Sequence, residues 1–382
     1  MKRLRVLHIT AWYPSPGQPV KGIFIKEHVQ ALQAHADNRV LHIETFFYGE
    51  KSLRYRAQQL SENEESYTYQ LAKKRWRLSE LLTGWLLFRE LVLKRKAAKA
   101  DVLNFYIAYP AGLFIPLLRL FIRKPMLFSE QWSAYHYNFY LPPGAENLQR
   151  IRNIFHRGLP LVAVSNAIGE DIRRFSGNAE LAYEIVPNVV SEAFAFHGKP
   201  APAQPVFFML NSWSRIKQPF VVIDAFAQLL RTHPGARLRI GGFGDLWEEI
   251  VRTVRERKLE AHIDLLGQLD KTQVCEELNG CTALVHASAY ETFSVICAEA
   301  ITCGAPVIAS NVGGIPGFIY EGNGVLVDDL QPESWRAAME QVIANEAKYE
   351  RRKIAQEAGE KFSSAAVGKK YFEILQRIAE NR

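Results

Sequence analysis

Short apolar runs alternate with longer stretches of helical spacing along most of the chain. In the first half the apolar runs lie at residues 4–10, 40–45, 102–106, 126–129 and 161–165. In the second half they lie at residues 206–210, 237–242, 263–266, 283–286 and 306–310. Strands that alternate with helices build parallel sheets, so this pattern predicts an α/β protein with Rossmann-like units.

The alternation is interrupted between Phe196 and Pro205, where HGKPAPAQ is rich in Pro and Ala and has no apolar period. A chain of 382 residues is also long for one domain. We therefore predict two domains, residues 1–196 and 197–363, followed by a final helix over residues 364–382.

Two stretches of the first half are less regular. Residues 49–74 are polar with little periodicity, which predicts a loop-rich region. Residues 78–98 form an amphipathic pattern in which Trp85 and Phe88 lie beside several basic residues. Such a helix either packs its apolar stripe onto the sheet or lies on a membrane surface, and the pattern alone leaves both alternatives open.

The stretch from Thr282 to Pro316 carries the densest candidate chemistry. An apolar strand at residues 283–286 leads through a small-residue loop into a helix, whose free N–H groups favour an anion. Glu291 precedes this helix and Glu299 lies inside it. Because carboxylates accept hydrogen bonds from hydroxyls, a ligand with both phosphate and polyol groups fits here, and a nucleotide sugar is such a ligand.

A second helix start lies at Pro219, a favourable first helical residue, and Lys217 comes just before it. Gly242 and Gly244 follow the next strand. In a parallel sheet these loops share the carboxyl edge, so the glycine loop is expected to line the nucleotide.

The segment around Glu291 resembles the E-x7-E segment of the retaining nucleotide-sugar glycosyltransferases of family 4, in glycosyl transferases group 1. The matching residues are Glu291, Glu299, Phe293, Ala300, Gly304, Pro306, Val307, Gly313 and Gly314. The resemblance implies the GT-B fold, two Rossmann-like domains facing across a cleft, with a last helix that crosses back to the first domain. It assigns Glu291 to the donor-sugar hydroxyls and Glu299 to the ribose, although Thr292 replaces the usual Gly.

Other site residues follow from the same resemblance. Lys217 is expected to pair with the donor diphosphate, and Arg215 to substitute for the family's Arg, whose position holds Ser212. The helix start at Phe293, Ser294 and Val295 is expected to bind the donor.

In the first domain, Gly22 resembles the glycine of the family's first loop. Gln131 stands where relatives often carry a His that lies close to the transferring sugar. A glutamine cannot carry a proton there, and His136 lies five residues later, so either residue could contact the sugar.

Charge and cysteine usage narrow the possible partners. Residues 1–200 hold 27 Lys and Arg against 17 Asp and Glu, a net of +10, while residues 201–382 hold 20 against 23, a net of −3. A basic first half suits anionic lipid, nucleic acid or an anionic acceptor, or is simply solvated. The four cysteines lack zinc spacing and no Asp-x-Asp occurs, so we expect no metal and no cofactor beyond the donor.

No run of 18 apolar residues occurs, and the apolar part of the start is too short for a signal peptide. We expect a cytoplasmic protein, with peripheral contact on the inner face of an anionic membrane as a further expectation.

The resemblance implies an enzyme that moves a sugar from UDP- or GDP-sugar to a glycan or lipid-linked acceptor with retention, in bacterial lipopolysaccharide or exopolysaccharide synthesis. The alternatives are a nucleotide-sugar 2-epimerase of the same fold, a donor-binding protein without catalysis, and a basic nucleic-acid-binding protein. No sequence motif supports the nucleic-acid-binding alternative, which depends on charge alone.

Overall fold

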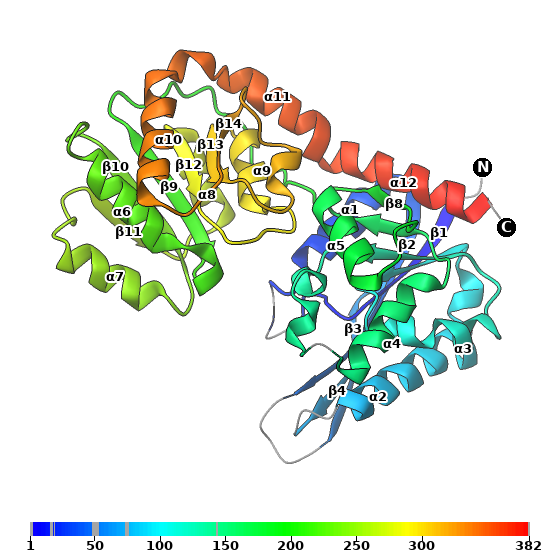
Figure 1. The fold of residues 1–382 in the computed structure, drawn as a ribbon. Coiled ribbons are helices and arrows are strands. Elements are labelled where there is room, and N and C mark those ends of the chain that lie inside the picture. Colours follow the sequence, from blue (N-terminus) through cyan, green and yellow to red (C-terminus); the bar gives the residue numbers. More distant parts are fainter. Residues whose placement is uncertain are drawn as a thin grey trace. The chain divides into compact units, whose positions relative to one another are not determined.

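The computed structural model describes residues 3–15, 18, 20–47, 53–72, 76–142 and 144–380. The chain divides into two compact units, one formed by residues 1–189 with 364–382 and one by residues 190–363 (Figure 1). The predicted boundary after residue 196 lies just inside the second unit. The final helix belongs to the first unit, so the second unit is an insertion in the sequence of the first.

The first unit is built on an eight-stranded sheet with the order β3-β4-β2-β1-β5-β6-β7-β8. Its strands are β1 Leu4–Thr10, β2 Ala36–Phe47, β3 Arg54–Ser61, β4 Glu64–Leu71, β5 Val102–Tyr106, β6 Met126–Glu130, β7 Leu161–Ala163 and β8 Tyr183–Ile185. Each pair is parallel except β3 with β4. The strand order reverses between β1 and β5, which is where doubly wound sheets open a crevice.

The antiparallel pair β3 and β4 corrects the loop predicted for residues 49–74, of which 49–52 and 73–74 lie outside the described residues. β3 is the edge strand, and most of its residues are exposed on both faces. An edge strand with no buried face needs no apolar alternation, so its sequence looks like a polar loop.

The helix predicted over residues 78–98 is shorter than expected: α2 covers Trp76–Phe88, and a π-helical turn, Arg89–Leu93, follows it. Its buried residues include Thr83, Leu86 and Leu87, and it packs against β2 and β4. Packing onto the sheet is therefore confirmed for one face of the helix. Leu81 and Trp85 on another face stay exposed.

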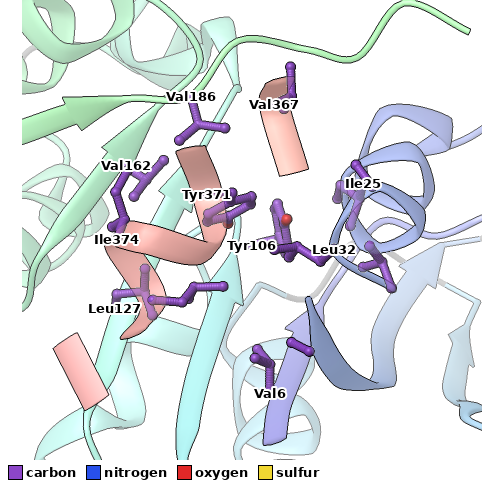
Figure 2. Close-up of a cluster of buried hydrophobic side chains, with 14 of the residues drawn as sticks. Val6, Ile25, Leu32, Tyr106, Leu127, Val162, Val186, Val367, Tyr371 and Ile374 are labelled. Carbon is purple, nitrogen blue, oxygen red and sulfur yellow. The ribbon is translucent and has the colours of Figure 1, made fainter. Parts of the chain in front are cut away.

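The core of the first unit lies between its sheet and two helices, α1 Ile23–Ala31 and α12 Ser364–Glu380 (Figure 2). Val6, Ile25, Leu127 and Tyr371 belong to this cluster. The Tyr371 hydroxyl also lies 2.6 Å from Asn104 Nδ2 and 2.5 Å from Ser129 Oγ. The last helix thus completes both the apolar core and a buried polar network.

The remaining helices of the first unit are α3 Ile115–Arg119, α4 Glu146–Arg152 and α5 Asn166–Ser176. At the start of α5, the Ser165 hydroxyl accepts a hydrogen bond from the Ile168 amide at 3.4 Å. This is an ordinary N-cap, which explains why α5 begins directly after Ser165.

The second unit has a six-stranded sheet in the order β11-β10-β9-β12-β13-β14, parallel throughout. The strands are β9 Val206–Ser212, β10 Arg237–Phe243, β11 Ile263–Gly267, β12 Ala283–His286, β13 Val307–Ser310 and β14 Gly324–Val327. The helices are α6 Pro219–Leu229, α7 Trp247–Glu256, α8 Lys271–Gly280, α9 Val295–Thr302, α10 Pro332–Ala344 and α11 Arg351–Phe362. Here the strand order reverses between β9 and β12.

Candidate functional site

The candidate site lies at the carboxyl ends of β9 and β12, where the order of the second sheet reverses. A 3-10 turn, Arg215–Lys217, follows β9 and leads into α6, and the loop of residues 287–294 follows β12 and leads into α9. The two loops are joined, because the Ala289 amide and the Ser288 hydroxyl donate to the Ile216 carbonyl at 2.8 and 3.3 Å. Two helix N-termini therefore begin beside one another, each with unpaired N–H groups suited to an anion.

Lys217 and Glu291 meet at this edge. Lys217 Nζ forms an ion pair with Glu291 Oε1, and His286 Nε2 lies 2.8 Å from the same oxygen. Asn211 Nδ2 lies 3.3 Å from His286 Nδ1 on the other side of the ring. When the Asn211 amide donates to Nδ1, the imidazole carries its proton on Nε2 and donates it to Glu291.

These partners decide the charge of Glu291. Burial by itself raises the pKa of this carboxyl, but the hydrogen bonds and electrostatic interactions with His286 and Lys217 outweigh burial and lower the pKa to about 2. Glu291 is therefore ionised at neutral pH. It can accept hydrogen bonds from hydroxyls, and it is too weak a base to act as a proton acceptor in that range.

The backbone around Glu291 is held by a pair of glycines. The Gly314 amide donates to the Glu291 carbonyl at 2.9 Å, and Gly313 adopts a φ of 56°. A Cβ on Gly313 would lie 1.8 Å from the Glu291 carbonyl oxygen. Any other residue at 313 would push the Glu291 backbone away, so the glycine fixes where the carboxylate stands.

The start of α9 has an unusual conformation. Ser294 precedes the helix at a φ of 74°, and its hydroxyl donates to Cys297 Sγ at 3.1 Å instead of capping the helix. The Ser294 side chain thus leaves the first-turn amides, beginning with Val295, available to a ligand. Glu299 lies further along the same helix and is partly exposed.

Gly242 and Gly244 lie at the end of β10 with φ values of 118° and 128°. A Cβ on Gly242 would lie 2.0 Å from the Asn211 carbonyl oxygen, and one on Gly244 would lie 2.5 Å from the Trp213 carbonyl oxygen. Close packing against the loop after β9 therefore explains both glycines. Their predicted contact with the nucleotide remains a prediction.

Two predicted residues of the second unit make no comparable contact with this cluster. Arg215 is exposed, and among the described residues no carboxylate pairs with it. The Phe293 side chain is buried in an aromatic group, with ring centroids 5.0 Å from Phe318 and 5.6 Å from Phe362. A donor contact from Phe293 can therefore come only from its backbone.

The predicted residues of the first unit lie near the carboxyl ends of β1 and β6. Gly22 precedes α1 at a φ of 66°, where a Cβ would lie 2.5 Å from the Trp12 carbonyl oxygen. Gln131 is buried, with Nε2 3.4 Å from His28 Nδ1. His136 is more exposed, with Nδ1 3.2 Å from the Asp171 carboxylate. Both alternatives for the sugar contact therefore already have a partner within the first unit.

Sequence reasoning did not single out His286 and Asn211. Both are polar residues within two positions of the carboxyl end of an otherwise apolar strand. Since neighbouring parallel strands end at the same edge, this pattern was a usable signal. It was hidden because the apolar run at residues 283–286 was interpreted only as a strand.

The described part of the chain contains no metal-binding cluster, no disulfide and no membrane-spanning helix. There, no group of three or more His, Cys, Asp or Glu side chains is arranged to hold a metal ion. The four cysteines, Cys275, Cys281, Cys297 and Cys303, are buried and form no disulfide. Within the described residues, every helix is too short or too polar to cross a bilayer.

The sequence is similar to known glycosyltransferases. The family model described as glycosyl transferases group 1 matches residues 190–362. D-inositol 3-phosphate glycosyltransferase of Segniliparus rotundus is 28% identical over 148 residues, covering 37% of this chain and 33% of that protein. Glycogen synthase of Mycobacterium tuberculosis is 26% identical over 200 residues, covering 50% of this chain and 47% of that protein. The chain thus aligns with a third to a half of these relatives' length.

Solved structures match almost the whole chain. The lipopolysaccharide outer core galactosyltransferase WaaB has a TM-score of 0.73 at 18% identity, covering 98% of this chain and 99% of that one. HepE of Anabaena, solved with UDP and glucose, has a TM-score of 0.72 at 18% identity, covering 98% of this chain and 100% of that one. Identities this low establish the fold alone. The protein therefore has the GT-B glycosyltransferase fold, and its residues 190–362 match the family model of glycosyl transferases group 1.

Proposed function

We propose that this protein transfers a sugar from a nucleoside diphosphate sugar, of the UDP or GDP class, to a glycan or lipid-linked acceptor with retention at the anomeric carbon. The observation that carries the proposal is the contact of Lys217 with Glu291 between two helix N-termini. A cation and free amides suit the diphosphate, and an ionised carboxylate suits the sugar hydroxyls.

In this proposal Lys217 and the amides at the starts of α6 and α9 stabilise the charge that develops on the departing diphosphate. The bond from the anomeric carbon to the diphosphate oxygen breaks, and a bond to the acceptor oxygen forms on the same face. The acceptor proton passes to the departing diphosphate. Glu291 is held by Lys217 and His286 and binds the sugar rather than attacking it, so no enzyme nucleophile and no metal enter the scheme.

The chemical class of the acceptor is inferred from the distribution of charge along the chain. Residues 1–200 carry the net positive charge of +10 counted above. A basic surface suits an acceptor that carries phosphate or is anchored in an anionic membrane. We infer a lipid-linked or lipopolysaccharide-type acceptor, or one in exopolysaccharide synthesis.

Thermal unfolding in EDTA with UDP, GDP, ADP, CMP and their sugars tests the donor site. One nucleotide should raise the melting temperature of the wild type and have little effect on Lys217→Ala or Glu299→Ala. Lys199→Ala is the matched control, because Lys199 pairs with Glu276 on the surface of the same unit. The proposal fails if no nucleotide stabilises the wild type, or if metal is required.

A second candidate is donor binding without catalysis, and one observation favours it. Ser212 is exposed at the end of β9 and supplies no charge where the resembling family has an Arg. Release of the nucleoside diphosphate on addition of acceptor separates the two candidates. Binding without release would favour this second candidate, and conversion of the donor without acceptor would favour an epimerase.

A further inference from the structure

Two helices of the first unit expose large apolar side chains that its core does not use. On α2, Leu81 is 65% exposed and Trp85 49%. On α3 and the residues after it, Leu117 is 44% exposed, Leu120 77% and Phe121 55%. We call these five residues the apolar patch.

The two segments that carry the apolar patch pack against each other. Leu81, Trp85 and Phe88 follow the spacing of one helix face. Phe88 meets Phe121 edge to face, with ring centroids 5.3 Å apart. Gly84 of α2 lies directly against the Phe114 ring, since a Cβ there would come within 2.3 Å of it. These contacts join α2 to Phe114 and Phe121, which lie on either side of α3.

The surroundings of the apolar patch are basic. Residues 111–125 contain Arg119, Arg123 and Lys124 and no acidic residue. Arg119 and Arg123 are exposed, and among the described residues no carboxylate pairs with either. Arg119 donates to the Arg157 carbonyl at 3.1 Å, and burial together with the charge of Arg119 lowers the pKa of Arg157. In the described part of the chain, the guanidinium groups of Arg119, Arg123 and Arg157 thus have no carboxylate partner.

The nearest acidic residue of α2 does not offset this charge. Glu80 is buried and points away from the patch, where its carboxylate meets Arg150 at 2.8 Å and the Tyr109 hydroxyl at 2.9 Å. Soluble monomers rarely expose a large apolar surface unless it binds something. A binding partner of the apolar patch therefore has to cover apolar side chains and supply negative charge to the arginine residues around them.

We propose that the apolar patch docks the protein on a membrane surface that contains anionic phospholipid. Leucine, tryptophan and phenylalanine side chains enter the region between headgroups and acyl chains, and Arg119 and Arg123 meet the phosphates. A second copy of this chain fits less well, because its patch would bring equal positive charges together. The proposal extends the lipid-linked acceptor of the proposed function, and the docking itself does not depend on catalysis.

Co-sedimentation of the full chain with vesicles tests the proposal, using phosphatidylcholine alone and phosphatidylcholine mixed with phosphatidylglycerol. Wild type should bind the mixed vesicles and be released by salt. The double variant Leu120→Glu/Phe121→Glu should bind at least about tenfold more weakly. Arg119→Gln and Arg123→Gln should each weaken binding about fivefold. Leu93→Glu is the matched control, since Leu93 is exposed on the same unit but outside the patch.

Three outcomes would overturn the docking proposal. The first is that wild type and the double variant bind the mixed vesicles equally well. The second is that Leu93→Glu weakens vesicle binding as much as the double variant does. The third is that wild type is a dimer and the double variant is a monomer. Thermal unfolding of each variant shows that it remains folded, which is expected because the replaced side chains are exposed. Lys217→Ala should bind vesicles like wild type, so failure of docking and failure of the donor site are told apart.

Discussion

Glu130 and Glu291 lie near the carboxyl ends of buried parallel strands, and their surroundings shift their pKa values in opposite directions. Glu291 has Lys217 and His286 beside it, and its pKa falls to about 2. Among the described residues, no cation lies against Glu130. Burial raises the pKa of Glu130 to about 7, although the Tyr135 hydroxyl and the Ala108 amide donate to it. A nearby positive charge is thus what separates an ionised carboxylate from one that holds its proton.

The raised pKa of Glu130 predicts a pH-dependent stability. Folding raises this pKa from 4.5 to about 7, so between these values the folded protein keeps a proton that the unfolded chain releases. The contribution of Glu130 to the free energy of unfolding should therefore be largest below pH 4.5 and fall by about 3 kcal/mol as the pH rises to 7. Urea unfolding across this range should show the decrease in wild type and not in Glu130→Gln. An unchanged pH dependence in the variant would contradict the assignment.

His286 should act through Glu291. Replacing it with alanine removes a hydrogen bond from the carboxylate, so the pKa of Glu291 should rise from about 2 towards its ordinary value of 4.5. The low pKa stabilises the fold above pH 4.5 and that contribution disappears as the pH falls to 2. The variant should thus lose about 2 kcal/mol at pH 7 and show a weaker acid dependence in urea unfolding.

His233→Ala provides the control for this experiment. His233 lies in the same unit at the end of α6, where Nδ1 is 3.0 Å from the Thr232 hydroxyl at the surface. Its replacement should leave both the stability and the acid dependence close to those of wild type. If both variants behave alike, His286 does not set the charge of Glu291.

At the scale of elements, the turn that follows β13 positions the loop that follows β12. Gly313→Ala would place a Cβ 1.8 Å from the Glu291 carbonyl at a φ that alanine disfavours. We expect a loss of about 1–3 kcal/mol in the free energy of unfolding and weaker donor binding, measured by urea unfolding and calorimetry. Gly317→Ala is the control, because a Cβ there meets nothing within 4 Å. Equal effects in both variants would rule out this positioning role.

The last helix gives a second prediction at this scale. Tyr371→Phe keeps the ring in the core and removes the hydroxyl that bonds to both Asn104 and Ser129. Because these groups are buried, the loss should lower the free energy of unfolding by about 1–3 kcal/mol in urea. Tyr140→Phe should have no measurable effect, since Tyr140 is exposed. A neutral Tyr371→Phe would mean that the network does not stabilise the attachment of α12.

Elements with a buried face were predictable from the sequence, and those without one were not. Residues 4–10, 102–106 and 283–286 were predicted with the bounds that the structure has, because buried parallel strands are continuously apolar. The hairpin of β3 and β4 was missed because β3, the edge strand of the pair, is mostly exposed and need not be apolar. Burial of the Phe293 side chain depends on Phe318 and Phe362, which are distant in sequence, and local pattern cannot reveal such a contact.

For the whole molecule, the alternation of strands and helices predicted the fold class, which the similar solved structures confirm. The sequence also pointed to Lys217 and Glu291, because each precedes a helix at a strand end. It did not reveal that one contacts the other, since only the strand order places the two loops side by side. The donor base, the sugar and the acceptor depend on side-chain shape, which periodicity does not encode.

The return of α12 to the first unit has a consequence for how the protein is made. During synthesis, residues 1–189 leave the ribosome before residues 364–382, so until then their core lacks Val367, Tyr371 and Ile374. Residues 190–363 are complete before then and can fold as a unit. The first unit therefore finishes folding last. Until α12 emerges, the apolar surface that it covers remains exposed. If translation stops late, this apolar surface stays accessible to chaperones and proteases.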